Sequence, residues 1–397
     1  MTKPISLTRR QAIALGISAF AGVSTSSLLD RIDAIDQTQA SSTTDRQEEF
    51  QVTDETPLKH RAIAKKLIYG GAASYTELTS DKKFANAVKQ EYGILIAPEE
   101  LMWAAVHPQR PQTFIFDRAD WLANFASQHE MLFGANLVWH EYMPKWFEET
   151  VDKQNVEKIL LGHIDKLTRH YAGKVDLWSV VNEAIRPEDG RSDGLRRTRW
   201  LETLGPEYIE ISFRAAAAAD PNALLYYNDN ALEFDVPYQE TRRTAVLKLL
   251  ERLKSRGVPI HALGIQSHLG GPWSISKNLR AFIRNVADLD LKILISELDV
   301  GDRELPKDIE SRDRTVARAY EDYLSEVLTE PAVIAVITWG LSDRYTWHSW
   351  YSPREDGAPA RPLPLDANYN RKLAWNAIAR AFDRAAIRET QPLKLQS

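Results

Sequence analysis

Polar side chains that could form an active site follow six consecutive apolar segments of the sequence, each at the point where the segment ends. These residues are Trp139-His140, Asn182-Glu183, Asn228-Asp229-Asn230, Gln266-Ser267-His268, Glu297-Leu298-Asp299 and Trp339. One carboxylate in such a position is weak evidence, because most of them cap a helix or pair with an arginine. Six polar segment ends in succession are hard to explain in that way, and they predict one shared site.

Two glutamates, Glu183 and Glu297, determine the chemistry that this set could perform. One carboxyl group can protonate the leaving oxygen of a glycosidic bond while the other attacks or stabilises the sugar carbon. Amide side chains can hold hydroxyl groups, and indole rings can stack against the apolar faces of sugars. The pattern therefore indicates hydrolysis of a glycosidic bond.

Other catalytic arrangements lack support in the sequence. There is no serine in an obvious nucleophile elbow and no His-Glu-x-x-His spacing on a helix. His163 and His170 lie seven residues apart on one expected helix, without carboxylates to complete a metal site, and we expect both at the surface. The chain has no cysteine, which excludes disulfides, iron–sulfur clusters and thiolate zinc sites. We expect neither a metal nor a cofactor.

Short apolar segments alternate with amphipathic stretches from residue 67 onwards. The expected strands are 67–73, 93–97, 132–139, 176–182, 223–228, 262–267, 292–298 and 333–339. Several are nearly continuous in Val, Ile, Leu and Tyr, as strands buried on both faces should be. The expected helices between them include 117–130, 156–171, 206–219 and 313–328.

This alternation predicts an α/β fold, a single (β/α)8 TIM barrel that forms one catalytic domain over residues 59–390. A doubly wound open sheet is the alternative, but no glycine-rich phosphate loop follows the first strand. In such a barrel the active site lies at the C-terminal ends of the strands, which is where the polar residues fall.

Composition limits the partners that the chain can have. Its 397 residues carry 50 Lys and Arg against 55 Asp and Glu, a formal net charge of −5. No basic excess is available to drive binding to nucleic acid or to an anionic membrane surface, and we exclude both as primary roles. The 11 tryptophans fit either a large core or platforms for sugar rings, and composition does not decide between them.

Residues 1–40 have the pattern of a targeting peptide. Arg9 and Arg10 precede a mildly apolar run, 12–23, which is too short to span a bilayer and is followed by a polar segment. The pattern is typical of a twin-arginine export signal, with 41–58 as a polar linker, and an amphipathic first helix is the alternative. We therefore expect export to the periplasm or medium, without a membrane anchor.

At the level of motifs the sequence resembles glycoside hydrolase family 10, the endo-β-1,4-xylanases, over about residues 67–385. The matching segments are LVWH (137–140), WSVVNEA (178–184), YYNDN (226–230), GIQSHL (264–269), ISELDV (295–300) and TWGLSDRYTW (338–347). Each alone is modest, but their order and spacing are specific. The resemblance implies a barrel that cleaves a polysaccharide or oligosaccharide without a cofactor, and we expect a monomer.

The same resemblance implies roles for the two glutamates. Glu183 would be the general acid/base, and Asn182 before it would hold the 2-hydroxyl of the reacting sugar. Glu297 would be the nucleophile, which gives a covalent glycosyl-enzyme and net retention of configuration. For these roles we expect a raised pKa for Glu183 and a low pKa for Glu297.

The resemblance also implies a surrounding set of residues. His268 would bond to Glu297, with Asp299 orienting its ring. The residues implied to line the sugar site are Trp139, His140, Gln266, Trp339 and Trp347. Two other tryptophans, Trp178 and Trp375, are expected in the core.

Three positions on the glycone side depart from the family pattern. Members usually read Glu-Asn-x-Met-Lys-Trp after the second strand, whereas residues 99–104 here read EELMWA, so Glu100 replaces the Asn. Trp103 replaces the Lys or, with a one-residue gap, matches the Trp, and the Lys is missing in both cases. The His of Gly-His-Thr-Leu-Val-Trp-His is Ala135. We expect Glu100 and Trp103 to contact the sugar, with Trp103 replacing hydrogen bonds by stacking.

The changes fall on sugar contacts and spare the catalytic residues, which predicts a working hydrolase with altered glycone recognition. The leading hypothesis is a retaining enzyme that cleaves internal β-1,4 bonds of xylan or a related β-glycan. A β-glucanase or a hydrolase of a decorated glycan is the alternative. A glycan-binding protein without hydrolytic activity is a third hypothesis, and the intact glutamate pair argues against it.

Overall fold

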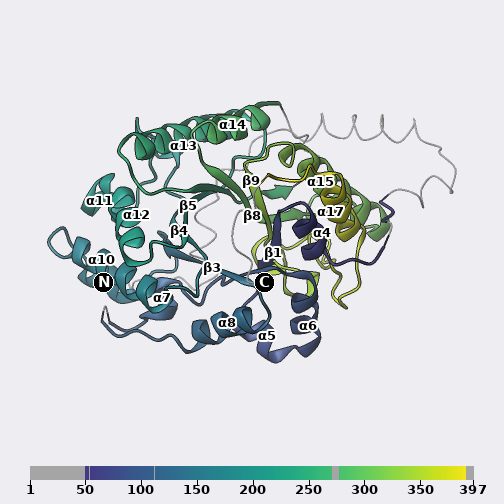
Figure 1. Ribbon diagram of the computed structural model, residues 1–397, viewed down its shortest axis with the longest axis horizontal. Coiled ribbons are helices and arrows are strands. Elements are labelled where there is room, and N and C mark those ends of the chain that lie inside the picture. The colour runs from purple at the N-terminus through teal and green to yellow at the C-terminus, as the bar shows by residue number, and fades with distance from the viewer. Residues whose placement is uncertain (1–49, 53, 111, 271–276, 390–397) are drawn as a thin grey trace, which may run out of the picture.

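The computed structural model describes residues 50–52, 54–110, 112–270 and 277–389. Eight parallel strands form a closed barrel at its centre (Figure 1). They are β1 (Ile68–Ala72), β2 (Ile94–Ile96), β3 (Leu132–Val138), β4 (Leu177–Asn182), β5 (Leu224–Asp229), β6 (Ala262–Ile265), β8 (Lys292–Gly301) and β9 (Val333–Thr338). Each strand pairs with the next, β6 pairs with β8, and β9 returns to β1. The prediction of a (β/α)8 barrel is confirmed, and all eight expected strands are present.

A short ninth strand, β7 (His268–Gly270), was not predicted from the sequence. It pairs in parallel with the last residues of β8, because β8 continues to Gly301, beyond the expected end at residue 298. In this register His268 lies opposite Asp299. The extra strand therefore fixes an imidazole beside a carboxylate at the C-terminal end of the barrel.

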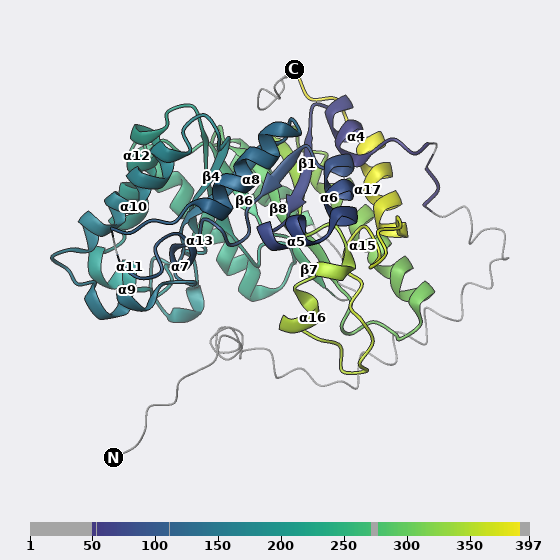
Figure 2. The ribbon, with the colours of Figure 1, turned by 90° about the horizontal axis from the view of Figure 1, so that it is seen from below.

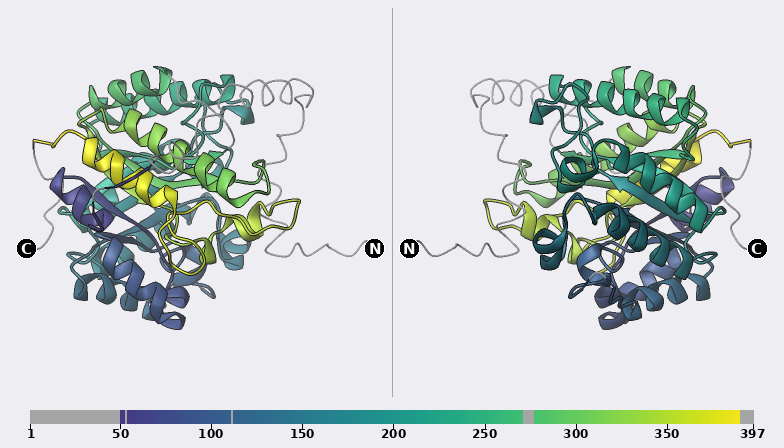
Figure 3. Two further views of the ribbon diagram at one scale, coloured as in Figure 1. Left: turned by 90° about the vertical axis from the view of Figure 1, so that its right-hand side faces the viewer. Right: turned by 90° about the vertical axis from the view of Figure 1, so that its left-hand side faces the viewer.

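Helices surround the barrel on all sides (Figures 1 and 3). They are α4 (Leu58–Ala64), α5 (Tyr75–Ser80), α6 (Lys82–Glu91), α7 (Trp103–Val106), α8 (Asp117–Gln128), α9 (Lys145–Thr150), α10 (Val156–His170), α11 (Arg199–Leu204), α12 (Glu207–Ala219), α13 (Pro237–Ser255), α14 (Lys277–Ala287), α15 (Ile309–Val327), α16 (His348–Tyr351) and α17 (Leu373–Arg384), with 3-10 turns at Pro187–Asp189 and Asp343–Tyr345. The four helices predicted by residue range correspond to α8, α10, α12 and α15. Helix α15 begins before the expected residue 313, because the side chain of Asp308 caps it by accepting the Ser311 N–H at 2.8 Å.

Apolar side chains pack in two layers. The inner layer fills the barrel, and the outer layer lies between the strands and the helices. Inner residues include Ile68, Ile94, Leu177, Leu224 and Ile337. Trp178 and Trp375 are fully buried in the outer layer, which confirms their expected place in the core.

Backbone conformation differs between the two ends of the barrel. Four non-glycine residues with positive φ follow four successive strands at the C-terminal end, and they are Tyr142, Glu183, Ala231 and Ser267. Such a residue costs free energy, of the order of 1 kcal/mol, and tends to occur where function requires it. At the opposite end, Lys66, Glu130 and Asp290 have positive φ just after α4, α8 and α14, as residues that terminate helices commonly do.

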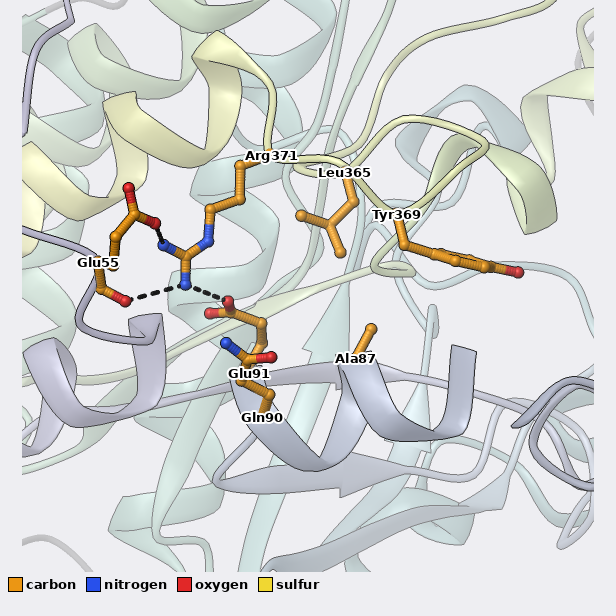
Figure 4. A pocket seen from close by; sticks show the side chains of 7 residues that line it. All are labelled: Glu55, Ala87, Gln90, Glu91, Leu365, Tyr369 and Arg371. Atoms are coloured by element: carbon orange, nitrogen blue, oxygen red, sulfur yellow. Dashed lines mark hydrogen bonds and ion pairs between the residues drawn. The ribbon is translucent and has the colours of Figure 1, made fainter. Parts of the chain in front are cut away.

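The described part of the expected linker packs against the barrel. Phe50 is 1% exposed and lies in the outer core layer. Arg371 pairs with both Glu55 and Glu91 beside a cavity of about 310 Å³ (Figure 4). The cluster joins the segment before α4 to the end of α6 and the start of α17. These three helices lie together on one side of the barrel, apart from β7 and α16 (Figure 2). Residues 1–49, which include the expected export signal, lie outside the described residues.

Candidate active site

Glu183 is placed by the end of β4 and by its own backbone. Asn182, the last residue of β4, pairs in register with Asn228 of β5. The Glu183 N–H then donates to the Asn228 carbonyl at 2.9 Å, and Glu183 adopts a φ of +57°. This turn aims the carboxylate across the barrel end, toward β6.

The Glu183 carboxylate is 9% exposed and has polar partners from three elements. Its Oε1 accepts from Asn182 Nδ2 at 3.2 Å and from Gln266 Nε2 at 3.0 Å. Its Oε2 lies 3.5 Å from Nη2 of Arg196. Two amides thus donate to one oxygen of the Glu183 carboxylate, and a guanidinium lies beside the other oxygen.

Glu297 lies within β8, where its N–H donates to the carbonyl of Gln266 at 2.9 Å. Its Oε1 accepts from Asn228 Nδ2 at 2.8 Å. The same Nδ2 donates to Asn182 Oδ1 at 3.0 Å, and Asn228 Oδ1 accepts from Ser296 at 2.6 Å. Asn228 therefore connects the two glutamates through one hydrogen-bond network.

His268 connects Glu297 to a fully buried carboxylate. Its Nε2 lies 3.3 Å from Glu297 Oε2, and its Nδ1 lies 3.1 Å from Asp299 Oδ1. Although burial lowers the pKa of His268, Asp299 and Glu297 raise it well above its ordinary value. His268 is therefore charged at neutral pH and donates to both carboxylates. The indole N–H of Trp347 fixes Asp299 from its other side, at 2.6 Å.

The expected order of the two glutamate pKa values is wrong for this chain. Burial raises the pKa of Glu183, but Arg196, with help from Gln266, outweighs burial and leaves that pKa below its ordinary value. For Glu297, burial and the charge of Glu183 raise the pKa above its ordinary value, although His268 and Asn228 oppose the rise. The lowered pKa of Glu183 follows mainly from Arg196, a residue that no sequence motif had indicated.

The remaining residues expected on the cleavage site lie around these groups. Trp139 and His140 border one narrow cavity together with Asn182 and Glu183. Burial, and then the charge of Arg196, lower the pKa of His140 to about 4, so its imidazole is neutral. The rings of Trp339 and Trp347 both lie edge-on to His268, at 6.5 and 5.1 Å between ring centres.

Trp103 does not lie where stacking on a sugar requires. It is 2% exposed, its indole N–H donates to the Leu137 carbonyl at 2.9 Å, and its ring stacks on His163 at 3.8 Å. This burial favours the alignment with a one-residue gap, in which Trp103 matches the Trp of the motif. The stacking role expected of Trp103 is therefore corrected.

Glu100 is also turned away from solvent. It is 6% exposed, and its Oε1 accepts the Tyr75 N–H at 2.6 Å at the start of α5. Burial raises the pKa of Glu100. The contact expected between Glu100 and a sugar has no support in this arrangement, because the carboxyl group packs against α5.

His163 is buried, contrary to its expected place at the surface. It is 1% exposed and lies on the apolar side of α10, three residues after Leu160 and four before Leu167. Its Nδ1 lies 3.0 Å from Nε2 of His107. The helical spacing from Leu160 and Leu167 was the signal that could have located it. His170 is exposed as expected.

Arg196 is the main functional residue that the sequence did not reveal. It is carried by a hairpin after β4, in which Ile185 pairs with Leu195 and the Arg196 N–H donates to the Ala184 carbonyl at 2.7 Å. Its Nε also donates to the Glu183 carbonyl at 2.7 Å. Only the fold brings a residue thirteen positions downstream back to Glu183.

In the part of the chain that the structure describes, no group of three or more His, Asp or Glu side chains is arranged to hold a metal ion. Among the same residues, no helix has the length and apolar character needed to cross a membrane. The groups gathered around Glu183 and Glu297 are carboxyl, amide, imidazole and guanidinium groups.

Comparison with known proteins places this architecture in a family. The family model for glycosyl hydrolase family 10 matches residues 58–381. A β-1,4-xylanase of Dictyoglomus thermophilum is 33% identical over 305 residues, which cover 74% of this chain and 84% of that protein. Endo-1,4-β-xylanase B of Thermotoga neapolitana is 32% identical over 328 residues, which cover 80% and 90% respectively.

Solved structures give the same result. The crystal structure of xylanase 10B from Thermotoga petrophila in complex with xylobiose superposes with a TM-score of 0.75 and 28% identity, covering 84% of this chain and 99% of that one. Native xylanase 10B from Thermotoga maritima superposes with a TM-score of 0.74 and 29% identity, covering 83% and 98%. From its fold, its strand-end residues and these matches, the chain belongs to glycosyl hydrolase family 10.

Proposed function

We propose that the chain is a retaining endo-β-1,4-xylanase with Glu183 as acid/base and Glu297 as nucleophile. The observation that carries this proposal is the network in which Asn228 donates to Glu297 at 2.8 Å and to Asn182 at 3.0 Å, beside Glu183. Through Asn228 and Asn182 the two carboxylates share one hydrogen-bond network, and each also has a cationic neighbour, Arg196 or His268. This supports a pair that acts on one glycosidic bond.

In the first step Glu183 gives its proton to the glycosidic oxygen, the bond between that oxygen and the anomeric carbon breaks, and Glu297 bonds to the carbon. In the second step Glu183 takes a proton from water, the water oxygen bonds to the carbon, and Glu297 leaves. Each step inverts the carbon, so the product retains its configuration. Charged His268 stabilises the Glu297 carboxylate on its release.

The raised pKa of Glu297 and the lowered pKa of Glu183 are compatible with these roles because the two carboxyl groups are coupled. Interacting carboxyl groups titrate as a pair, and the proton is held by the pair rather than by one residue. When substrate is bound, the glycosidic oxygen beside Glu183 can accept that proton. The hydrogen bonds of Asn228 and His268 to Glu297 favour its charged form at the same time.

The proposal is tested with xylo-oligosaccharides by following the anomeric configuration of the first product by NMR. A β-configured product that mutarotates later is expected, and Glu297→Gln should lower kcat by about 10⁴-fold or more, the size of effect seen for an essential nucleophile. An α-configured first product, or an unchanged rate in the Glu297→Gln variant, would exclude the mechanism. Glu207→Gln, at the start of α12, is the matched control.

A β-glucanase, or a hydrolase of a decorated glycan, is the second candidate. It is favoured by the loss of three glycone donors, which are the Asn replaced by Glu100, the Lys missing before Trp103 and the His replaced by Ala135. Turnover of xylo-oligosaccharides is compared with that of cello-oligosaccharides of equal length, and higher kcat/KM on the cello series would support the second candidate. Tight binding of both series without turnover would indicate a glycan-binding protein.

We also propose that the chain is exported through a twin-arginine signal, which the sequence of residues 1–40 supports, and that it acts as a monomer. Replacing both Arg9 and Arg10 by Lys in the full chain should abolish export, whereas the full chain with its unaltered signal should be exported. Light scattering after size exclusion should give the mass of one chain, and twice that mass would contradict the proposal.

A further inference from the structure

On the glycone side of the site, three hydrogen-bond donors of the family pattern are missing. Glu100 accepts a backbone N–H of α5, Trp103 is inside the core, and Ala135 is 2% exposed. A hydrogen bond to a sugar hydroxyl contributes about 0.5–1.5 kcal/mol, so losing several would weaken glycone binding substantially. Another residue must therefore contact the glycone if the proposed function holds.

Tyr142 is the large side chain that this wall exposes. It lies in the loop after β3 and is 43% exposed. Its carbonyl accepts the Ala104 N–H at 2.9 Å, which joins its loop to the start of α7 and therefore to the segment around Glu100. Tyr142 thus lies on the same side as the missing donors.

The ring of Tyr142 stacks on a tryptophan expected at the cleavage point. The ring centres of Tyr142 and Trp139 are 5.6 Å apart, and their planes differ by 23°. The two rings form an offset, nearly parallel pair, so the exposed ring of Tyr142 lies directly beside Trp139. Trp139 borders the same narrow cavity as Glu183.

The backbone of Tyr142 is unfavourable for a residue of its type. Its φ is +53°, a region in which a bulky side chain is a clear outlier. The residue is 43% exposed, so burial in the core does not account for this conformation. Strained residues of this kind tend to occur at functional positions, which points to a role for the position of the ring.

The loop that carries Tyr142 faces the acid/base. The neighbouring Glu141 lies 3.6 Å from His140, and burial together with the charge of Glu183 raises its pKa to about 7. The pKa of Tyr351 is raised by burial and then by the charges of Glu141 and Glu183. Tyr351 in turn packs against Trp347, whose indole N–H holds Asp299.

We propose that Tyr142 is a specificity-determining residue on which a glycone sugar stacks, one residue further from the cleaved bond than the sugar on Trp139. The ligand is an unbranched β-1,4-linked pyranoside, whose ring faces carry C–H groups that suit an aromatic surface. Stacking on Tyr142 replaces the hydrogen bonds that the wall has lost. This inference rests on the proposed function, because it assigns the glycone side from it.

The test compares two aryl glycosides that share a leaving group. An aryl β-xylobioside occupies the proposed position on Tyr142, whereas an aryl β-xyloside ends before it. Tyr142→Ala should lower kcat/KM on the xylobioside by about 3- to 10-fold, from the strength of one aromatic contact, and leave the xyloside within twofold. Tyr142→Phe should retain the wild-type ratio, because it keeps the ring.

Equal losses on both substrates, or a Tyr142→Phe variant as impaired as Tyr142→Ala, would overturn the inference. Ile387→Ala removes another exposed apolar side chain, from the other end of the barrel, and should change neither substrate. Titration of xylobiose by calorimetry provides a readout without turnover. If wild type cleaves neither substrate, the proposed function fails, and weaker xylobiose binding by Tyr142→Ala still decides the inference.

Discussion

Glu183 is subject to two nearby charges of opposite sign, and each can be removed by one substitution. The guanidinium of Arg196 lies 3.5 Å from its carboxylate and favours the charged form. Glu141 interacts with it as a second negative charge when ionised. Because such interactions are reciprocal, Glu141 opposes the effect of Arg196 on Glu183.

Removing the guanidinium should extend the protonated state of Glu183 to higher pH. In Arg196→Met the pKa of Glu183 rises, so the alkaline limb of kcat/KM against pH moves upward. The loss of a charged donor to the Glu183 carbonyl should also lower the free energy of unfolding by about 1.5–3 kcal/mol. Arg196→Lys keeps the charge and should shift the alkaline limb less. If the alkaline limb lies at the same pH in both variants and in wild type, Arg196 does not control the pKa of Glu183.

Removing the Glu141 carboxyl should act in the opposite direction. The pKa of Glu141 is raised to about 7 by burial and by Glu183, so it gains its negative charge as the pH rises through that value. That charge makes loss of the Glu183 proton harder. In Glu141→Gln the alkaline limb of kcat/KM should therefore move to lower pH. Glu141→Asp keeps the charge and is measured in parallel as the control. An upward shift would contradict this sign.

Among elements, the hairpin after β4 determines where Arg196 lies. Gly194 has a φ of +71°, and a Cβ added there would lie 2.7 Å from Cβ of Ala245 on α13. Gly190, four residues earlier, has a φ of +74° and no heavy atom within 4 Å of such a Cβ. The two glycines share a backbone conformation but differ in their surroundings.

This difference gives a matched pair of variants. Gly190→Ala should cost about 1–2 kcal/mol of stability, the cost of a side chain in this conformation, with unchanged kcat. Gly194→Ala must also displace the hairpin and should cost about 1–3 kcal/mol more, with a lower kcat and an altered alkaline limb. Urea unfolding and pH profiles measure both effects. Equal kcat in the two variants would show that catalysis does not depend on the position of the hairpin.

The elements were predictable where one local pattern sufficed. Short apolar runs between amphipathic stretches located all eight barrel strands, because strands buried on both faces are apolar along most of their length. Strand β7 begins with the polar His268 and lies outside any apolar run, and it pairs only with the extension of β8 beyond residue 298. The glutamates and His268 followed from strand ends, whereas Arg196 and the burial of Trp103 depend on how distant segments meet.

Over the whole molecule, the catalytic residues and the helices around α4 are stabilised by separate clusters. Arg371 pairs with Glu91 at 2.9 Å and lies over the ring of Trp375 at 3.7 Å. Glu91 also accepts the Leu58 N–H at 2.8 Å, at the start of α4. The cluster connects α4, α6 and α17 and shares none of these contacts with the Glu183 network.

Arg371→Ala should therefore change stability without changing catalysis. It leaves the buried Glu91 carboxylate without its cation, which should lower the free energy of unfolding by about 3 kcal/mol. kcat and KM at 25 °C should stay within twofold of wild type. Arg303→Ala, whose partner Glu355 is exposed, is the control and should cost less than about 1 kcal/mol. A lowered kcat in Arg371→Ala would show that this cluster and the catalytic site are coupled.

Both ends of the described chain lie against the helices beside β1. Phe50 lies under Arg380 of α17, and the Arg388 N–H donates to the Lys65 carbonyl at 3.1 Å, just before β1. A support or a second protein attached at residue 389 would therefore lie at the start of the strands, away from Glu183 and Glu297 at their ends. Immobilised through that position, the enzyme would present its active site outward to a solid polysaccharide.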